Sequence, residues 1–263
     1  MHEADSIVLL VQPDLGQILS STFIESALLD AGLGYSRRLR LSLEEEVGRP
    51  GELKLLFHDE ETSSQTDTLP ICSFTVAIGL GRKPSVRTGV LDRVAVAAIV
   101  AMLLAPAGPR VEQMLPLLLA GNWMRQSLDM TYDPVFTGLR DSLLENRLVT
   151  MHSIAEIESV DMLDLPGIQT DLLRELQNEW PRLDLDARAQ GLSTLAEPLL
   201  SGTAGTARLE ELIWHRLLSP ASEVDLASQC SQVRRMLKSS EPEQRLLIAD
   251  ALIDGLIRTG RLC

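Results

Sequence analysis

The period of the hydrophobic pattern changes near Leu91, and this change restricts the chain to few fold classes. Before it, apolar residues form short β-rich runs or alternate with polar residues, which is typical of strands. After it, apolar residues recur every three to four positions between proline and glycine breaks, which is typical of helices. We therefore expect an α+β fold, in which a small mixed β-sheet (β-α-β-β-β) in the N-terminal third packs against a larger all-helical C-terminal part.

Four strands and one helix are predicted within residues 1–90. Residues 6–11 form an almost continuous apolar run, which is typical of a strand buried on both faces. Asp14 and Gln17 have the spacing of a capping box, and the helix that follows them ends at Gly32. The other predicted strands comprise residues 39–43, 53–57 and 71–80. We expect residues 1–90 to form an α/β subdomain.

Residues 91–263 are predicted to form a helical subdomain without strands. Its apolar run at residues 94–105 is too short for a bilayer, which needs roughly 20 residues. We interpret this run as the central buried helix, in which Ile99→Asp would prevent folding. The last helix is predicted to end at Gly260. The candidate helices comprise residues 91–105, 110–129, 134–148, 152–163, 169–179, 186–200, 206–218, 222–238 and 241–259, and the apolar stripe of the last is Leu247, Ile248, Ala251, Leu252 and Leu256.

Charge and cysteine content exclude several classes of function. The 24 basic and 37 acidic residues give a net charge of −13, which repels nucleic-acid phosphates, so no duplex nucleic acid is expected as a ligand. Cys72, Cys230 and Cys263 are widely spaced and predict neither a disulfide framework nor a zinc site. The acidic N-terminus has no signal-peptide core. We expect a cytoplasmic protein with no membrane span, no metal and no cofactor.

The segment between residues 79 and 93 is the strongest candidate for a binding site. Four cations lie near two glycines in an acidic chain, between a predicted strand and a predicted helix, where anions commonly bind. The third glycine of a dinucleotide fingerprint and the Gly-Lys-Ser/Thr end of a P-loop are missing, and Pro84 removes one N–H donor. A basic surface that meets an acidic protein is the other interpretation. The candidate anion- or partner-binding residues are Gly79, Gly81, Arg82, Lys83, Ser85, Arg87 and Arg93.

The remaining polar clusters suggest no chemistry, and no catalytic residue is predicted. The four histidines lack metal-binding spacing. Residues 164–167 match a GTPase D-x-x-G element, but the upstream phosphate loop that this element requires is missing. Two acidic clusters, residues 44–46 and 59–61, are interpreted as solubility features. The basic residues Arg37, Arg38 and Arg40 are expected to pair with these acidic turns.

Three functional hypotheses follow. The leading one is a non-enzymatic protein that binds another protein, as an adaptor, a chaperone-like factor or an assembly subunit of an oligomer or heteromeric complex. The alternative is an enzyme or sensor that binds a phosphorylated small molecule or nucleotide at residues 79–93. A winged-helix regulator built from the last helices is disfavoured by the negative charge.

Overall fold

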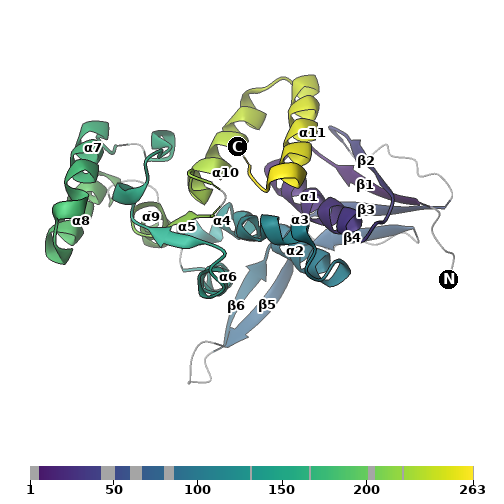
Figure 1. Ribbon diagram of the computed structural model, residues 1–263, viewed down its shortest axis with the longest axis horizontal. Coiled ribbons are helices and arrows are strands. Elements are labelled where there is room, and N and C mark those ends of the chain that lie inside the picture. Colours follow the sequence, from purple (N-terminus) through teal and green to yellow (C-terminus); the bar gives the residue numbers. More distant parts are fainter. Residues whose placement is uncertain are drawn as a thin grey trace. The chain divides into compact units, whose positions relative to one another are not determined.

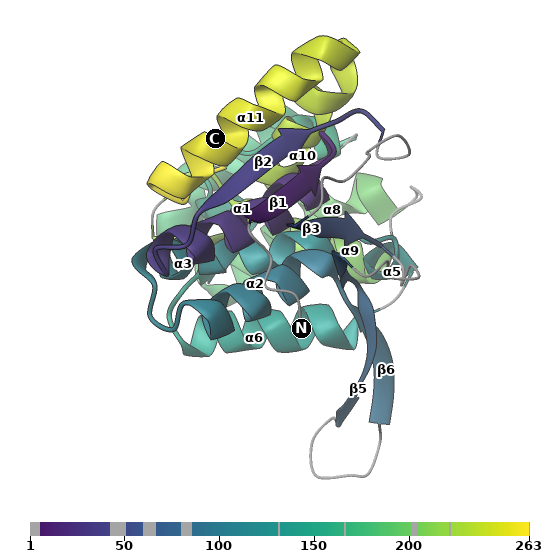
Figure 2. The same cartoon turned by 90° about the vertical axis from the view of Figure 1, so that its right-hand side faces the viewer.

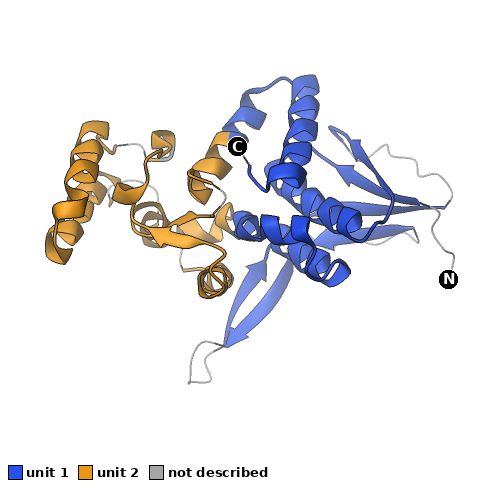
Figure 3. Ribbon diagram, in the orientation of Figure 1, with its two compact units in different colours: residues 1–122, 233–263 blue, residues 123–232 orange. Residues whose placement is uncertain are grey.

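The computed structural model describes residues 6–42, 51–59, 67–79, 86–130, 132–165, 167–200, 205–220 and 222–262. It divides into two compact units, residues 1–122 with 233–263 and residues 123–232 (Figure 3). The boundary expected near residue 90 lies inside the first unit, because helices from both sides of it pack together. The first unit is therefore built from both ends of the chain.

A parallel four-stranded sheet with the order β2-β1-β3-β4 forms one layer of the first unit (Figure 1). The strands are β1 (Ser6–Val11), β2 (Tyr35–Leu39), β3 (Glu52–His58) and β4 (Thr68–Cys72). Val8 to Val11 are all buried, as the apolar run predicted. The strand predicted at residues 39–43 is displaced towards the N-terminus, because β2 pairs with β1 through polar residues that show no apolar alternation.

The central helix of this unit is α1 (Leu15–Asp30), in which every residue from Leu15 to Leu28 is buried. It packs on β1 and β3, and on α2 (Arg93–Leu104), α3 (Pro109–Met114) and α11 (Pro242–Thr259) (Figure 2). Asp14 caps its start by accepting a hydrogen bond from the Gln17 amide, which is half of the predicted capping box. The other half is missing, because Gln17 Oε1 accepts from the Gln12 amide and not from the Asp14 amide. The expectation that residues 94–105 form the central helix is wrong, because α1 is enclosed by the sheet and three helices.

Arg37 joins three elements of the first unit. Its Nη1 lies 2.9 Å from Glu25 Oε2 on α1, and its Nη2 lies 2.7 Å from Asp250 Oδ1 and 2.7 Å from Asp254 Oδ1 on α11. Burial raises the pKa of Glu25, although the Arg37 guanidinium opposes this. The predicted pairing of Arg37 with acidic turns is therefore wrong. Its partners lie on the preceding helix α1 and on α11, which is more than 200 residues away.

The second unit is mainly helical, and the α+β class with a helical C-terminal part is confirmed. The prediction that no strand follows residue 90 is wrong, because β7 (Thr150–His152) pairs antiparallel with β8 (Arg216–Leu218). Three residues are too few to show an alternating period. The helical elements of this unit are α5 (Ser127–Met130), α6 (Pro134–Glu145), η2 (Ile154–Glu156), η3 (Met162–Asp164), α7 (Thr170–Glu179), η4 (Trp180–Arg182), α8 (Leu185–Leu200) and α9 (Thr206–Ile213).

The remaining helices connect the units or close the chain. The chain passes between the units within α4 (Ala120–Trp123) and within α10 (Leu226–Ser239), and η1 (Leu115–Leu119) belongs to the first unit. α11 ends at Gly260, which has the left-handed φ of 64° that favours glycine, as predicted. Its buried face differs from the predicted stripe, since Ala249, Ile253 and Leu256 are buried and Leu247 is 72% exposed. Within the described ranges, no helix has the length and apolarity needed to cross a membrane.

Candidate functional site

A strand, a loop and a helix were predicted around the site segment, and the structure adds a second strand, antiparallel to the first, directly before the helix α2. β5 (Phe74–Gly79) pairs with β6 (Val86–Leu91), a strand that the sequence interpretation missed. We call this hairpin the arm. Residues 71–80, predicted as one strand, are divided at Ser73 between β4 of the parallel sheet and β5 of the arm. The arm projects away from the rest of the first unit (Figures 1 and 2).

One face of the arm is apolar and lacks a cover. Among the described elements, β5 and β6 pack substantially only on each other. On this face Phe74 is 42% exposed, and Val76 and Ile78 are partly exposed. The register places Phe74, Val76 and Ile78 opposite Leu91, Gly89 and Arg87 on one face. An apolar stripe that a core would normally bury is thus open.

The structure brings only part of the predicted site together. Gly79 pairs with Val86, and the exposed Arg87 lies opposite Ile78 at the far end of the arm. Arg93 lies at the base of the arm in the first turn of α2, separated from that end by a strand about 17 Å long. The predicted residues Gly81, Arg82, Lys83 and Ser85 lie outside the described residues.

Asn122 fastens the base of the arm. Its Nδ2 donates to the Val90 carbonyl over 2.7 Å, and its Oδ1 accepts from the Asp92 amide over 3.1 Å. Asn122 is fully buried, and Asp92 in turn caps α2 by accepting from the Val94 amide. A side chain at Gly121 would collide with the Asp92 carboxylate. Two buried polar residues and one glycine therefore hold the end of β6.

Arg93 makes a second attachment at the carboxyl edge of the parallel sheet. Its Nη2 lies 2.8 Å from Asp14 Oδ1, its Nη1 lies 2.9 Å from Asp59 Oδ1, and its amide donates to Ser73 Oγ over 3.0 Å. Gly16 leaves room for the guanidinium, since a Cβ there would lie 2.6 Å from Nη2. Burial raises the pKa of Asp14, while Arg93 acts in the opposite direction.

This edge of an open parallel sheet, between β1 and β3, is where α/β proteins commonly bind ligands. In this protein the Arg93 guanidinium occupies the position between the two carboxylates. The arrangement neutralises buried charge and fixes the start of α2, which continues directly from the arm. Its chemical role is attachment.

A second apolar surface lies on α2. Its inner face is buried through Val94, Ala97, Ala98 and Ala101, whereas Leu103 is 76% exposed. Ile99 is also exposed, so the burial on which the predicted effect of Ile99→Asp depends is wrong. Alanines make up most of the buried face, which also includes Val94 and Val96, whereas the exposed residues are the large Ile99, Met102, Leu103 and Leu104. Helical periodicity alone did not separate these faces because almost every residue of the run is apolar.

The residues that build this site were only partly recognisable in the sequence. Asp14 was predicted as a helix cap, and Asp59 was placed in an acidic cluster. Asn122 gave no signal, because its partners are backbone groups 30 and 32 positions away. Among the described residues, no cluster of three or more His, Cys, Asp or Glu side chains is suited to a metal ion.

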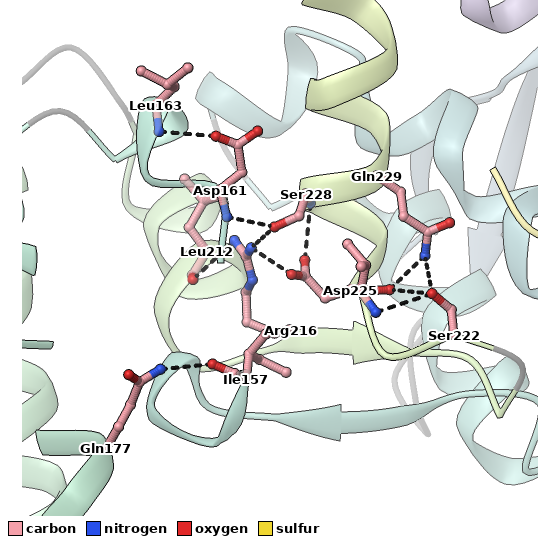
Figure 4. Close-up of polar contacts among 11 residues, drawn as sticks. Ile157, Asp161, Leu163, Gln177, Leu212, Arg216, Ser222, Asp225, Ser228 and Gln229 are labelled. Atoms are coloured by element: carbon pink, nitrogen blue, oxygen red, sulfur yellow. Dashed lines mark hydrogen bonds and ion pairs between the residues drawn. The ribbon is translucent and has the colours of Figure 1, made fainter. Parts of the chain in front are cut away.

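A buried polar network in the second unit was also missed (Figure 4). Arg216 Nη2 lies 2.8 Å from Asp225 Oδ2 and 2.8 Å from Ser228 Oγ, and Ser228 Oγ accepts from the Asp161 amide. Arg216 and Asp225 are 1% and 0% exposed, so no solute reaches them. The network joins β8, the start of α10 and the turn before η3. Its role is structural.

Arg140, Glu211 and His215 form a further charged cluster in this unit. Glu211 Oε1 accepts a hydrogen bond from Arg140 and lies 3.3 Å from His215 Nδ1. Glu211 is buried on α9, while its two partners are partly exposed. The arginine neutralises the carboxylate and holds α6 to α9. Nothing in the cluster positions a nucleophile.

Comparison with known proteins adds no assignment. No protein-family model matches the chain, and no curated protein matches its sequence significantly.

Proposed function

We propose that this protein is a cytoplasmic, non-enzymatic subunit that binds another protein through the arm. One observation carries the proposal: the arm exposes an apolar face, while its base is fixed by buried polar residues. A two-stranded hairpin alone is at best marginally stable in water. Buried polar groups nevertheless hold this hairpin in a fixed position. We infer that the position of the arm serves its function.

Charge favours an acidic partner. Residues 74–91 contain three basic residues and no acidic residue, while the whole chain has a net charge of −13. Arg87 is exposed beside the apolar stripe. Complementary charge accelerates association and restricts the choice of partner. The exposed apolar residues of α2 supply a further surface for the same partner.

The alternative, binding of a phosphorylated small molecule at residues 79–93, is less well supported. Both Nη atoms of Arg93 already contact carboxylates, and Arg87 lies at the opposite end of the arm. A phosphate site would need these cations to converge. A thermal-shift screen with phosphorylated compounds tests it, and a shift abolished by Arg87→Gln would favour this alternative.

The experiment for the proposed function is site-specific crosslinking. A photo-crosslinking amino acid at Thr88 on the arm should yield one heteromeric product, which mass spectrometry then identifies. The matched control places it at Leu185, which is 82% exposed on the second unit. The identified partner, purified, must bind wild-type protein and lose most of its affinity for Phe74→Asp, which changes an exposed residue. Equal products at both positions, or unchanged binding by Phe74→Asp, contradict the proposal.

A further inference from the structure

The side chain of Asn122 occupies the place of a neighbouring strand along β6. Within a parallel ladder, one residue donates to a carbonyl of the adjacent strand and accepts from an amide two positions further on. Asn122 makes this pair of bonds with the Val90 carbonyl and the Asp92 amide. The outer edge of β6 is therefore already paired at its base. The side-chain amide of Asn122 makes the two hydrogen bonds that one residue of a neighbouring strand would make.

The next backbone groups of this edge follow from the alternation of the ladder. Val90 directs its carbonyl away from β5, so Thr88 and Val86 also direct their amides and carbonyls outward. No described residue pairs with these groups. Thr88 and Val86 are exposed. An open edge of this kind is a template for another strand.

We propose that the outer edge of β6 accepts an extended acidic segment of the partner protein as a third strand. This inference rests on the proposed function and specifies how the arm binds. A third strand stabilises a sheet that is only marginally stable with two strands. It would form hydrogen bonds with the backbone groups of Val86 and Thr88, as the Asn122 side chain does with the Val90 carbonyl.

The occupant is acidic because Arg87 is exposed on β6 and neither β5 nor β6 contains an acidic residue. A second copy of this chain is disfavoured, since pairing two β6 edges would bring one Arg87 near the other. Alternating apolar side chains on the added strand would extend the stripe of Phe74, Val76 and Ile78.

The test uses a capped peptide of alternating valine and glutamate, with a valine–lysine peptide as its charge control. We expect the glutamate peptide to slow hydrogen exchange of the Val86 and Thr88 amides about tenfold or more, observed by NMR on the full chain. The lysine peptide should have no effect. Equal binding of both peptides, or no binding of either at about 1 mM, overturns the inference.

Two proline variants identify the edge. Thr88→Pro removes an outward-facing donor of β6, and Ala77→Pro makes the same change on the outer edge of β5, where proline is tolerated. We expect Thr88→Pro to weaken peptide binding about tenfold and Ala77→Pro to change it less than about twofold. The reverse order overturns the assignment to β6. Arg87→Glu leaves the backbone intact and should also weaken binding, so unchanged affinity in this variant contradicts the charge argument.

Failure of this inference can be distinguished from failure of the proposed function. If the crosslinked partner requires Phe74 but tolerates Thr88→Pro, the arm binds through its apolar face, and strand addition is wrong. If neither variant affects the partner, both proposals are wrong. Competition by duplex DNA against the glutamate peptide would also overturn the choice of an acidic polypeptide.

Discussion

At the scale of residues, three polar side chains decide how the first unit closes. Asn122 attaches the arm to α4, and Arg93 attaches it to the edge of the parallel sheet. Arg37 attaches α11 to α1 and β2. Each is largely buried, and each contacts groups that lie far away in the sequence. Removing one partner of such a contact leaves a buried polar group unpaired, which costs more than the contact itself contributes.

Asn122→Ala tests the attachment of the arm. The Val90 carbonyl and the Asp92 amide lose their partner, so the free energy of unfolding should fall by about 1–3 kcal/mol. Urea denaturation measures it. Asn146→Ala, which removes an exposed side-chain amide at the end of α6, is the control and should change stability by less than about 0.5 kcal/mol. Equal effects of the two substitutions would show that the arm base is not held by Asn122.

Glu25 should make stability depend on pH. Burial raises the folded pKa of Glu25 above its ordinary value, so the stabilising contribution of this carboxyl is complete below the ordinary pKa and is lost as pH rises through the folded pKa. Glu25→Gln lacks this titration. The free energy of unfolding of wild type minus that of the variant should therefore decrease between about pH 4 and pH 7 in urea titrations. An increase would contradict the raised pKa.

At the scale of elements, α2 and α11 show that the position of a helix can be predicted from the sequence when its buried face cannot. Both helices lie where the pattern predicted them. The face that each buries was decided by its neighbours. α2 places alanines against α1, and α11 buries Ala249, Ile253 and Leu256 while Leu247 is exposed.

Paired substitutions on α2 test which face is buried. Leu103→Glu adds charge to the exposed face and should change the free energy of unfolding by less than about 0.5 kcal/mol. Ala97→Glu places an unpaired carboxylate in the fully buried face and should abolish cooperative unfolding, because its cost is comparable to a total stability of about 5–15 kcal/mol. Circular dichroism melts distinguish them. Similar melts for both variants would contradict the described orientation of α2.

Two helical glycines provide an opposite pair of predictions. At Gly121 a Cβ would collide with the Asp92 carboxylate, so Gly121→Ala should destabilise the protein by about 1–3 kcal/mol. Gly138 on α6 has open space at this position, so Gly138→Ala should stabilise by about 0.5–1 kcal/mol through helix propensity. Denaturant titration shows whether each substitution raises or lowers the free energy of unfolding. Stabilisation by Gly121→Ala would show that the Asp92 cap is not tightly placed.

At the scale of the whole molecule, the first unit is discontinuous. Residues 233–263 return to the unit formed by residues 1–122, and α11 covers α1, α3 and β2. The hydrophobic pattern separates N-terminal strands from later helices. The compact units follow a different division, because the last helix completes the N-terminal layer.

A chain ending at residue 240 should therefore lose more than its last helix. Without α11, the apolar and charged surface of α1 is uncovered, and Arg37 loses two of the three carboxylates that balance its charge. We expect loss of the cooperative thermal transition of the first unit, measured by circular dichroism. Leu247→Ala, on the exposed face of α11, is the control and should melt as wild type does. A truncated protein with an unchanged transition would show that α11 is peripheral.

By itself, the sequence determined the α+β class, the buried strand β1, the capped start of α1 and the positions of α2 and α11. These features depend on caps and hydrophobic periods, which are properties of neighbouring residues. Only the tertiary structure decided that residues 71–80 divide between two sheets, that β6 exists, that Arg93 is fixed by Asp14 and Asp59, and that Asn122 pairs with the arm. These features depend on contacts between distant segments, whose free energy overrides local preference and leaves no periodic trace in the sequence.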